Sequence, residues 1–125
     1  MIRVMKRSWL ILAIISFISV IALPVKATET RCGWLQVPSR MNWFLKDRDG
    51  TWIILLQGES PPPGMETIPS HGDEKEVVRT APSRGYSCTC LNVIVDRNSM
   101  RIIEIRGGEA LPLSTCREDP SLPKE

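Results

Sequence analysis

Four cysteines carry the clearest chemical signal in the sequence: Cys32, Cys88, Cys90 and Cys116. An even number of cysteines in an exported chain is typical of a disulfide framework. Zinc-binding cysteines usually come in pairs with two to four residues between them, and redox-active pairs usually enclose two residues, whereas Cys88 and Cys90 enclose one. The sequence therefore predicts two disulfides, and a thiol-redox or metal-binding role for the Cys-x-Cys pair is the alternative.

The two neighbouring cysteines are not expected to bond to each other, because side chains two residues apart on a strand point the same way with nearly parallel Cβ vectors. Two pairings remain: Cys32–Cys88 with Cys90–Cys116, or Cys32–Cys90 with Cys88–Cys116. Loop-closure entropy does not choose between them, since the long and short loops contribute about 4 and about 3.5 kcal/mol in either case. Both pairings fasten residues near the two ends of the mature chain to one strand.

Acid–base catalysis has few candidates. His71 is the single histidine, and it lies in a segment rich in proline and glycine, where it is expected to be solvated. Two carboxylates facing one bond could hydrolyse a glycoside, and the candidates are Asp47, Asp49, Glu59 and Glu104. The run Asp47–Gly50 is more typical of a hairpin turn than of a calcium loop, because the later carboxylate of that motif is missing. We therefore expect no catalytic residue, metal or cofactor, and a small carboxylate-dependent cell-wall hydrolase is the alternative.

Aromatic residues are the remaining candidates for binding. Trp34, Trp43 and Trp52 recur at intervals of nine residues. Trp34 and Trp52 are expected to fill the core of a small domain. Trp43 and Phe44 are adjacent, so on a regular strand they point to opposite faces, and one of them is left to stack on a sugar or on a partner's side chain. Trp43 and Phe44 are therefore the predicted binding surface.

The first 27 residues are predicted to be a cleaved secretory signal peptide. Residues 1–8 are short and basic, residues 9–23 are apolar except for two serines, and Pro24 precedes a cleavage site that ends at Ala27. The apolar run is shorter than the ~20 residues of a spanning helix, so no membrane span is expected after processing. We expect the mature protein to be exported, periplasmic or secreted, and monomeric.

Length and charge narrow the class of protein. A chain of 125 residues with 42% hydrophobic and 24% charged residues is typical of one globular domain. Residues 1–27 contain four of the 16 basic residues and none of the 14 acidic ones, so residues 28–125 carry a net charge of −2. A nucleic-acid partner is therefore not expected.

Turn and strand signals place these residues on short strands. Residues 42–46 and 51–57 are aromatic and β-branched runs on either side of Asp47–Gly50, and they predict a hairpin. The segment 58–76 contains a triple proline and three glycines without any regular period, so it is expected to be a long surface loop. Residues 76–80 are expected to add a short strand.

Residues 86–96 and 101–106 predict a second hairpin. Its core face is expected to be shared by Leu91, Val93, Val95, Ile103 and Ile105, which requires odd positions to oppose odd positions and a loop of three or five residues. The tail after residue 117 is expected to be loose. Residues 28–125 thus predict one all-β domain, a compact sandwich or partly open barrel of about five or six short strands stapled by two disulfides.

Several separated motifs give the sequence a resemblance to a known family. In chain order they are Arg31-Cys32-Gly33-Trp34, Asn42-Trp43, Asp47-Arg48-Asp49-Gly50 with Trp52, Gly85–Leu91, and Leu111–Arg117 with Asp119. Over residues 30–123 the chain resembles a family of small exported bacterial proteins catalogued only as a domain of unknown function. The resemblance implies a bacterial source and export, but it implies no reaction and assigns no catalytic residue. The triple proline at 61–63 departs from the family pattern.

These features together favour a non-enzymatic, disulfide-stabilised binding or interaction module of the bacterial cell envelope. The expected partner is an envelope protein or a glycan. The expected contact surface is the 58–76 loop with Trp43 or Phe44.

Overall fold

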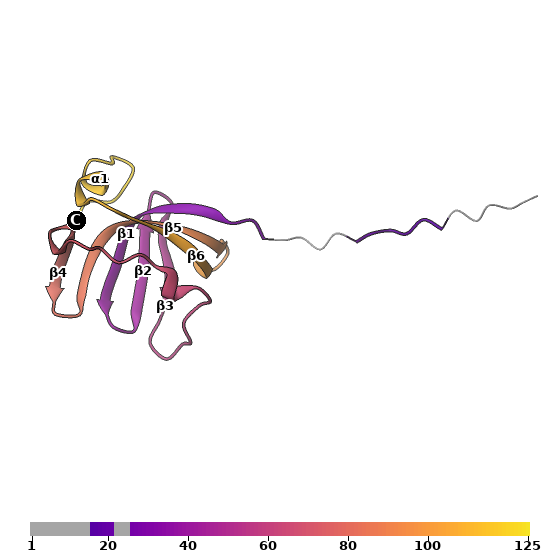
Figure 1. Ribbon diagram of the computed structural model, residues 1–125, viewed down its shortest axis with the longest axis horizontal. Helices are drawn as coiled ribbons and strands as arrows, with labels where there is room; N and C mark the ends of the chain where they lie inside the picture. The colour runs from indigo at the N-terminus through magenta and orange to yellow at the C-terminus, as the bar shows by residue number, and fades with distance from the viewer. Residues whose placement is uncertain (1–15, 22–25) are drawn as a thin grey trace, which may run out of the picture.

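The computed structural model describes residues 16–21 and 26–125. The predicted signal peptide, residues 1–27, falls largely outside the described residues, and residues 16–21 contain no helix or strand (Figure 1). Within the described ranges, none of the helices has both the length and the apolar character needed to cross a bilayer.

Strands dominate the domain, and the helices are single turns (Figure 1). The strands are β1 (Glu29–Ser39), β2 (Asn42–Asp47), β3 (Gly50–Leu55), β4 (Val77–Ala81), β5 (Arg84–Asp96) and β6 (Arg101–Leu111). The helical turns are η1 (Met65–Thr67), η2 (Glu74–Glu76) and α1 (Leu113–Arg117). The first hairpin, the second hairpin and the short strand near residues 76–80 all lie where the sequence predicts them.

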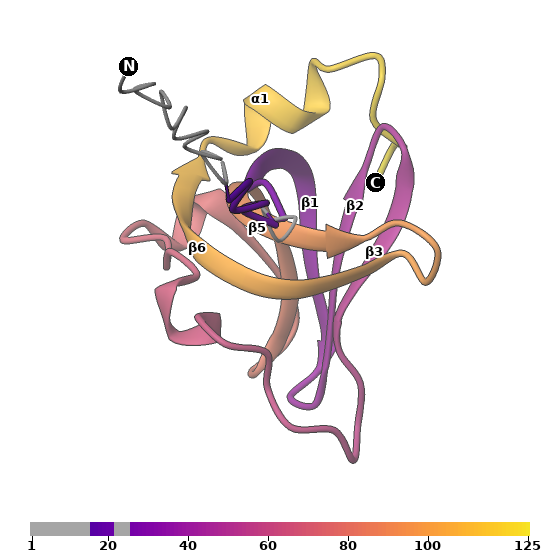
Figure 2. The same cartoon turned by 90° about the vertical axis from the view of Figure 1, so that its right-hand side faces the viewer.

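Five of the strands close into a ring, which Figure 2 shows curling around one interior. The sheet order is β1-β2-β3-β6-β5-β4, and an additional antiparallel pairing between β1 and β5 completes the ring. The contact between β3 and β6 is parallel and limited to the pair Ile53 and Arg101, so this seam is the weakest part of the ring. With β4 set aside, the connectivity is that of an OB-fold, a five-stranded partly open barrel, and the predicted all-β class is confirmed.

Two apolar clusters lie on opposite sides of this sheet. The larger fills the ring and consists of Leu35, Leu45, Trp52, Ile54, Leu55, Leu91, Val93, Ile102 and Ile105. The smaller lies outside the ring beneath α1 and contains Trp34, Cys88, Leu113 and Cys116. Trp34 and Trp52 are 3% and 1% exposed, so their predicted place in the core is confirmed.

The predicted register of the second hairpin is confirmed away from its loop, where Val93 pairs with Ile105, but it was wrong beside the loop. Asp96 pairs with Arg101, which leaves a loop of residues 97–100 rather than one of odd length. The pairing then shifts between Ile94 and Val95, so that Ile103 is an unpaired bulge residue. A bulge re-aims the side chains on either side of it, and as a result Ile102 rather than Ile103 enters the core.

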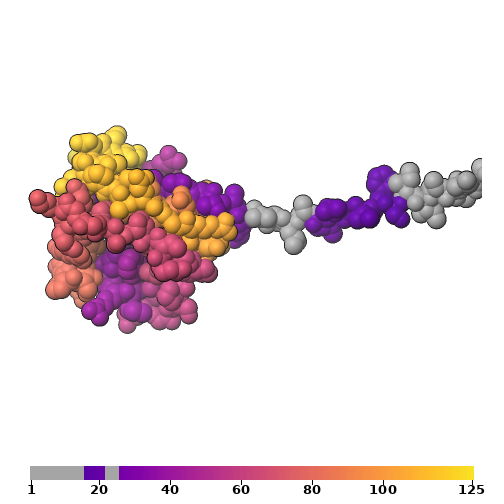
Figure 3. All heavy atoms as spheres, viewed as in Figure 1, coloured from indigo at the N-terminus to yellow at the C-terminus, as the bar shows by residue number. Residues whose placement is uncertain are grey.

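The segment between β3 and β4 packs against β6 and forms part of the domain surface (Figure 3). The Ile105 amide donates to the Pro63 carbonyl at 2.9 Å, and the Gly107 amide donates to Thr67 Oγ1 at 2.9 Å. Met65 and Ile68 pack against the core inside the ring. The segment therefore covers one side of the barrel.

The tail after Arg117 differs from the expected loose segment. Trp34 Nε1 donates to the Pro123 carbonyl at 2.9 Å, and Leu122 packs against the smaller apolar cluster. Glu125 accepts hydrogen bonds from Arg117 Nε at 2.7 Å and from the Tyr86 hydroxyl at 3.0 Å. These contacts attach the tail to the outer face of β1 and β5.

Gly33 is expected to be intolerant of any side chain. A Cβ at this position would lie 2.1 Å from the Lys46 carbonyl oxygen, which belongs to the paired strand β2 and cannot move aside. Gly33→Ala should therefore lower the free energy of unfolding by about 1–3 kcal/mol, measured by urea denaturation of the oxidised protein. Gly72→Ala is the matched control, because no atom lies within 4 Å of its added Cβ. Equal midpoints for the two variants would contradict the close approach.

Candidate functional site

Both disulfides end on β5. Cys32 is bonded to Cys90, its direct cross-strand neighbour on β5, and Cys88 is bonded to Cys116 of α1. This selects one of the two pairings that the sequence left open. The described residues contain no free cysteine. All four cysteines are therefore engaged in these two disulfides.

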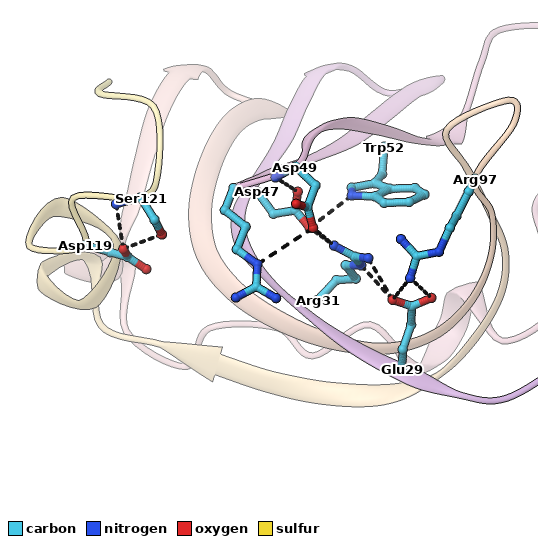
Figure 4. Close-up of polar contacts among 9 residues, drawn as sticks. Glu29, Arg31, Asp47, Asp49, Trp52, Arg97, Asp119 and Ser121 are labelled. Carbon is cyan, nitrogen blue, oxygen red and sulfur yellow. Dashed lines mark hydrogen bonds and ion pairs between the residues drawn. The ribbon is translucent and has the colours of Figure 1, made fainter.

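An arginine network closes one end of the ring (Figure 4). Arg31 and Asp47 are 6% and 4% exposed, and Arg31 Nη1 donates to Asp47 Oδ2 at 3.2 Å. Arg31 also donates to Asp49 and, through Nη2, pairs with Glu29 Oε2 at 2.8 Å. Arg97, in the loop between β5 and β6, donates to the same Glu29 carboxylate at 2.9 Å. The network thus joins β1, the β2–β3 hairpin and the β5–β6 hairpin.

Trp52 connects this network to the core. The Arg31 guanidinium lies 4.6 Å from the centroid of the Trp52 ring, a cation–π contact. Trp52 Nε1 donates to Asp47 Oδ2 at 3.0 Å, and the Asp49 amide donates to Asp47 Oδ1 at 2.8 Å. Both oxygens of the buried Asp47 carboxylate therefore have donors, which a buried charge requires.

The electrostatics of the network keep Arg31 and Asp49 charged. Burial alone would lower the pKa of Arg31, but its hydrogen bonds to Asp49, Asp47 and Glu29 together raise that pKa above the ordinary value. The hydrogen bond from Arg31 lowers the pKa of Asp49. Asp49 is therefore more strongly ionised than a solvated aspartate, the opposite of a catalytic general acid, whose pKa is raised.

The other carboxylates considered for hydrolysis are also held by arginines. Glu59 accepts from Arg101 Nη1 at 2.7 Å, and this hydrogen bond lowers the pKa of Glu59. Glu104 accepts from Arg106 at 3.3 Å. The structure thus brings Asp47 and Asp49 together on one arginine, but it places Glu59 and Glu104 in separate ion pairs. None of this resembles an acid and a base on either side of a substrate bond.

His71 was expected to be solvated, but it is half-buried. Its Nε2 lies 3.0 Å from the Leu111 carbonyl oxygen, so that nitrogen carries a proton and donates it. The histidine attaches the β3–β4 segment to the end of β6. No second polar side chain orients the ring among the hydrogen bonds of the described residues, and a general base would need one.

Trp43 and Phe44 lie at the opposite end of the ring. Trp43 packs against the core inside the ring, whereas Phe44 belongs to neither apolar cluster and pairs with Gln36 and Ile53 on the outer face. Both rings are half-buried. The predicted division of the two aromatics between opposite faces of β2 therefore matches their contacts.

Trp43 borders a cavity of about 170 Å³ at this end. Leu35, Val37 and Val77 form apolar walls, and Ser87 is a buried polar residue of the lining. Arg79 and Arg84 are exposed members of the same lining. Concave, mostly apolar sites with a few polar groups are the usual form of a binding site. The barrel thus has a buried ion-pair network at one end and an aromatic cavity at the other.

Sequence reasoning missed the arginine network and the cationic rim of the cavity. Arg31 and Asp47 are 16 residues apart, and no local pattern relates them. One feature of the sequence could have pointed to the network: Arg31, Asp47 and Trp52 all belong to the motifs that carry the family resemblance. Arg79 and Arg84 lie in no motif, and only the β4–β5 pairing brings them to Trp43.

A small, disulfide-stapled, partly open β-barrel is the class that the fold and the site define. The chain belongs to the family described as Protein of unknown function (DUF4087), whose model matches residues 26–123. No curated protein and no solved structure matches the chain. Membership therefore agrees with the resemblance seen in the sequence and assigns no activity to any residue.

Arg31→Met should destabilise the fold more than loss of any surface arginine. The substitution leaves the buried Asp47 carboxylate without its cation, and such a loss costs about 3 kcal/mol. Arg106→Met is the control, because Arg106 and Glu104 form an ion pair on half-exposed side chains, which contributes less than about 1 kcal/mol. Urea denaturation measures both. An Arg31→Met variant as stable as the control would show that the network does not close the barrel.

Mild reduction should open Cys32–Cys90 before Cys88–Cys116. Cys32 is exposed, whereas Cys88 and Cys116 are 0% and 4% exposed, so a small thiol reaches the first bridge only. Partial reduction followed by alkylation and mass spectrometry should label Cys32 and Cys90 first. Simultaneous labelling of all four cysteines would contradict the protected position of the second bridge.

Proposed function

We propose that this chain is a non-enzymatic binding module of the bacterial cell envelope, which binds its partner at the open end of the barrel through the Trp43 cavity. The observation that carries this proposal is the concave site itself, in which an aromatic ring, apolar walls and exposed cations come together. Phe44 lies on the outer face and is not part of the site.

Two further observations support this reading. Disulfides persist in oxidising compartments, and two of them in a chain with a predicted leader support export. The side chains that the hydrolase and thiol alternatives require are engaged in ion pairs and disulfides. What remains accessible is a surface suited to binding.

The test compares two neighbouring aromatics that face opposite sides of one strand. Immobilised oxidised protein is incubated with envelope extracts and with purified envelope glycans, and retained material is identified. Wild type and Phe44→Ala should retain the same component, and Trp43→Ala should lose at least about 90% of it, since buried aromatic anchors commonly contribute 2 kcal/mol or more.

Because Trp43 is half-buried, Val37→Ser repeats the test with a smaller change in the same cavity. It should reduce retention while Phe44→Ala does not. Equal retention by wild type, Trp43→Ala and Val37→Ser, or retention of nothing by wild type, would contradict the proposed function.

A further inference from the structure

The strand β4 has one edge that no other described strand covers. It stands at the end of the sheet order and pairs only with β5, through Val77–Ser87, Val78–Tyr86 and Arg79–Gly85. Arg79 and Thr80 are exposed. An unpaired edge presents main-chain donors and acceptors that an extended peptide can satisfy by adding a strand.

The Trp43 cavity lies beside this edge. Val77 and Arg79, two residues apart on β4, both line it, together with Trp43 on β2. Side chains two residues apart on a strand share a face, so a strand added to β4 would place alternate side chains over the cavity. The cavity is small, about 170 Å³, and its walls are mostly apolar. It therefore suits one apolar side chain.

The charges at this edge identify the partner. Arg79 pairs with Glu74 at 2.9 Å, and Arg84 takes part in no ion pair of the described residues. A second copy of the chain, added antiparallel with full overlap of its own β4, would set Arg79 opposite Arg79. Like charges directly opposite each other destabilise a strand pair. An acidic side chain in that position would instead be attracted to Arg84, and it would compete with Glu74 for Arg79.

We propose that β4 accepts an extended segment of a partner protein as an added strand, with an acidic side chain opposite Arg79 and an apolar side chain, two residues away, in the Trp43 cavity. This inference rests on the proposed function and names its partner class. Main-chain hydrogen bonds hold the segment, and the cavity and the arginines select its sequence. Glycans and a second copy of the chain are excluded by the proposal and serve as outcomes of its test.

The probe is a ten-residue peptide of threonines with leucine and glutamate two residues apart at its centre. Two matched peptides are compared with it. One has lysine in place of glutamate. The other has the same side chains but carries N-methyl groups on the alternate amides that would face β4, so those amides cannot donate to the edge. Nuclear magnetic resonance of the ¹⁵N-labelled oxidised protein follows the amides of β4 and the indole N–H of Trp43.

The glutamate peptide should shift the amides of Val77–Ala81 and the Trp43 indole, and should bind at least tenfold more tightly than either matched peptide. Arg84→Glu should reverse the preference between the glutamate and lysine peptides. This substitution should leave the fold intact, because Arg84 is exposed. Binding of the N-methylated peptide with equal affinity, or no shift on β4 at the solubility limit, would overturn the proposal.

Other outcomes separate this inference from the proposed function. If envelope material is retained through Trp43 while all peptides leave β4 unshifted, strand addition fails and the binding module stands. If a purified glycan shifts the Trp43 indole and competes for the cavity, the partner is a glycan and the inference is wrong. A β4-dependent dimer in sedimentation would show that a second copy occupies the edge, which also contradicts it.

Discussion

Two disulfides that end on one strand are the constraint on which the rest of this small domain depends. Cys90 and Cys88 of β5 bind residues 58 positions earlier and 28 positions later in the chain. By loop-closure entropy the two bridges contribute about 4 and about 3.5 kcal/mol, against a typical net stability of ~5–15 kcal/mol for a domain. Because β5 also pairs with β1, β4 and β6, fastening Cys32 and Cys116 to it fixes the frame in which the cavity and the arginine network form.

The two ends of the barrel differ in structure. At one end, Arg31, Asp47 and Trp52 form a buried polar closure whose groups all have partners. At the other end, the ring is left with a cavity beside Trp43 and an unpaired edge on β4. Many residues of the family motifs serve the disulfides and the arginine network, but Trp43 and Gly85–Ser87 also belong to the motifs and line the cavity, so the family pattern reaches both ends of the barrel. A fold alone does not give an activity, and the binding proposal accordingly rests on the open end.

The strands, the hairpin at Asp47–Gly50, the core positions of Trp34 and Trp52, and the presence of two disulfides could be predicted from the sequence, because alternation, turn residues and cysteine counts are local signals. The pairing of the cysteines could not be predicted, since both arrangements close loops of nearly equal entropy. The bulge at Ile103 could not be predicted either, because Ile102 and Ile103 are chemically alike and only packing decides which of them enters the core. Three further features depend on tertiary contacts that no local pattern encodes. They are the contact of Arg31 with Asp47, the attachment of the tail through Pro123, and the position of Arg84 beside Trp43.

The most direct test is to map the disulfides of the oxidised, unreduced protein by fragmentation mass spectrometry that cleaves the backbone on both sides of Thr89. The structure predicts one fragment in which Cys90 carries the peptide of Cys32, and another in which Cys88 carries the peptide of Cys116. Fragments that join Cys32 to Cys88 and Cys90 to Cys116, or that contain unmodified thiols, would contradict the anchoring of both chain ends to β5 in the form described.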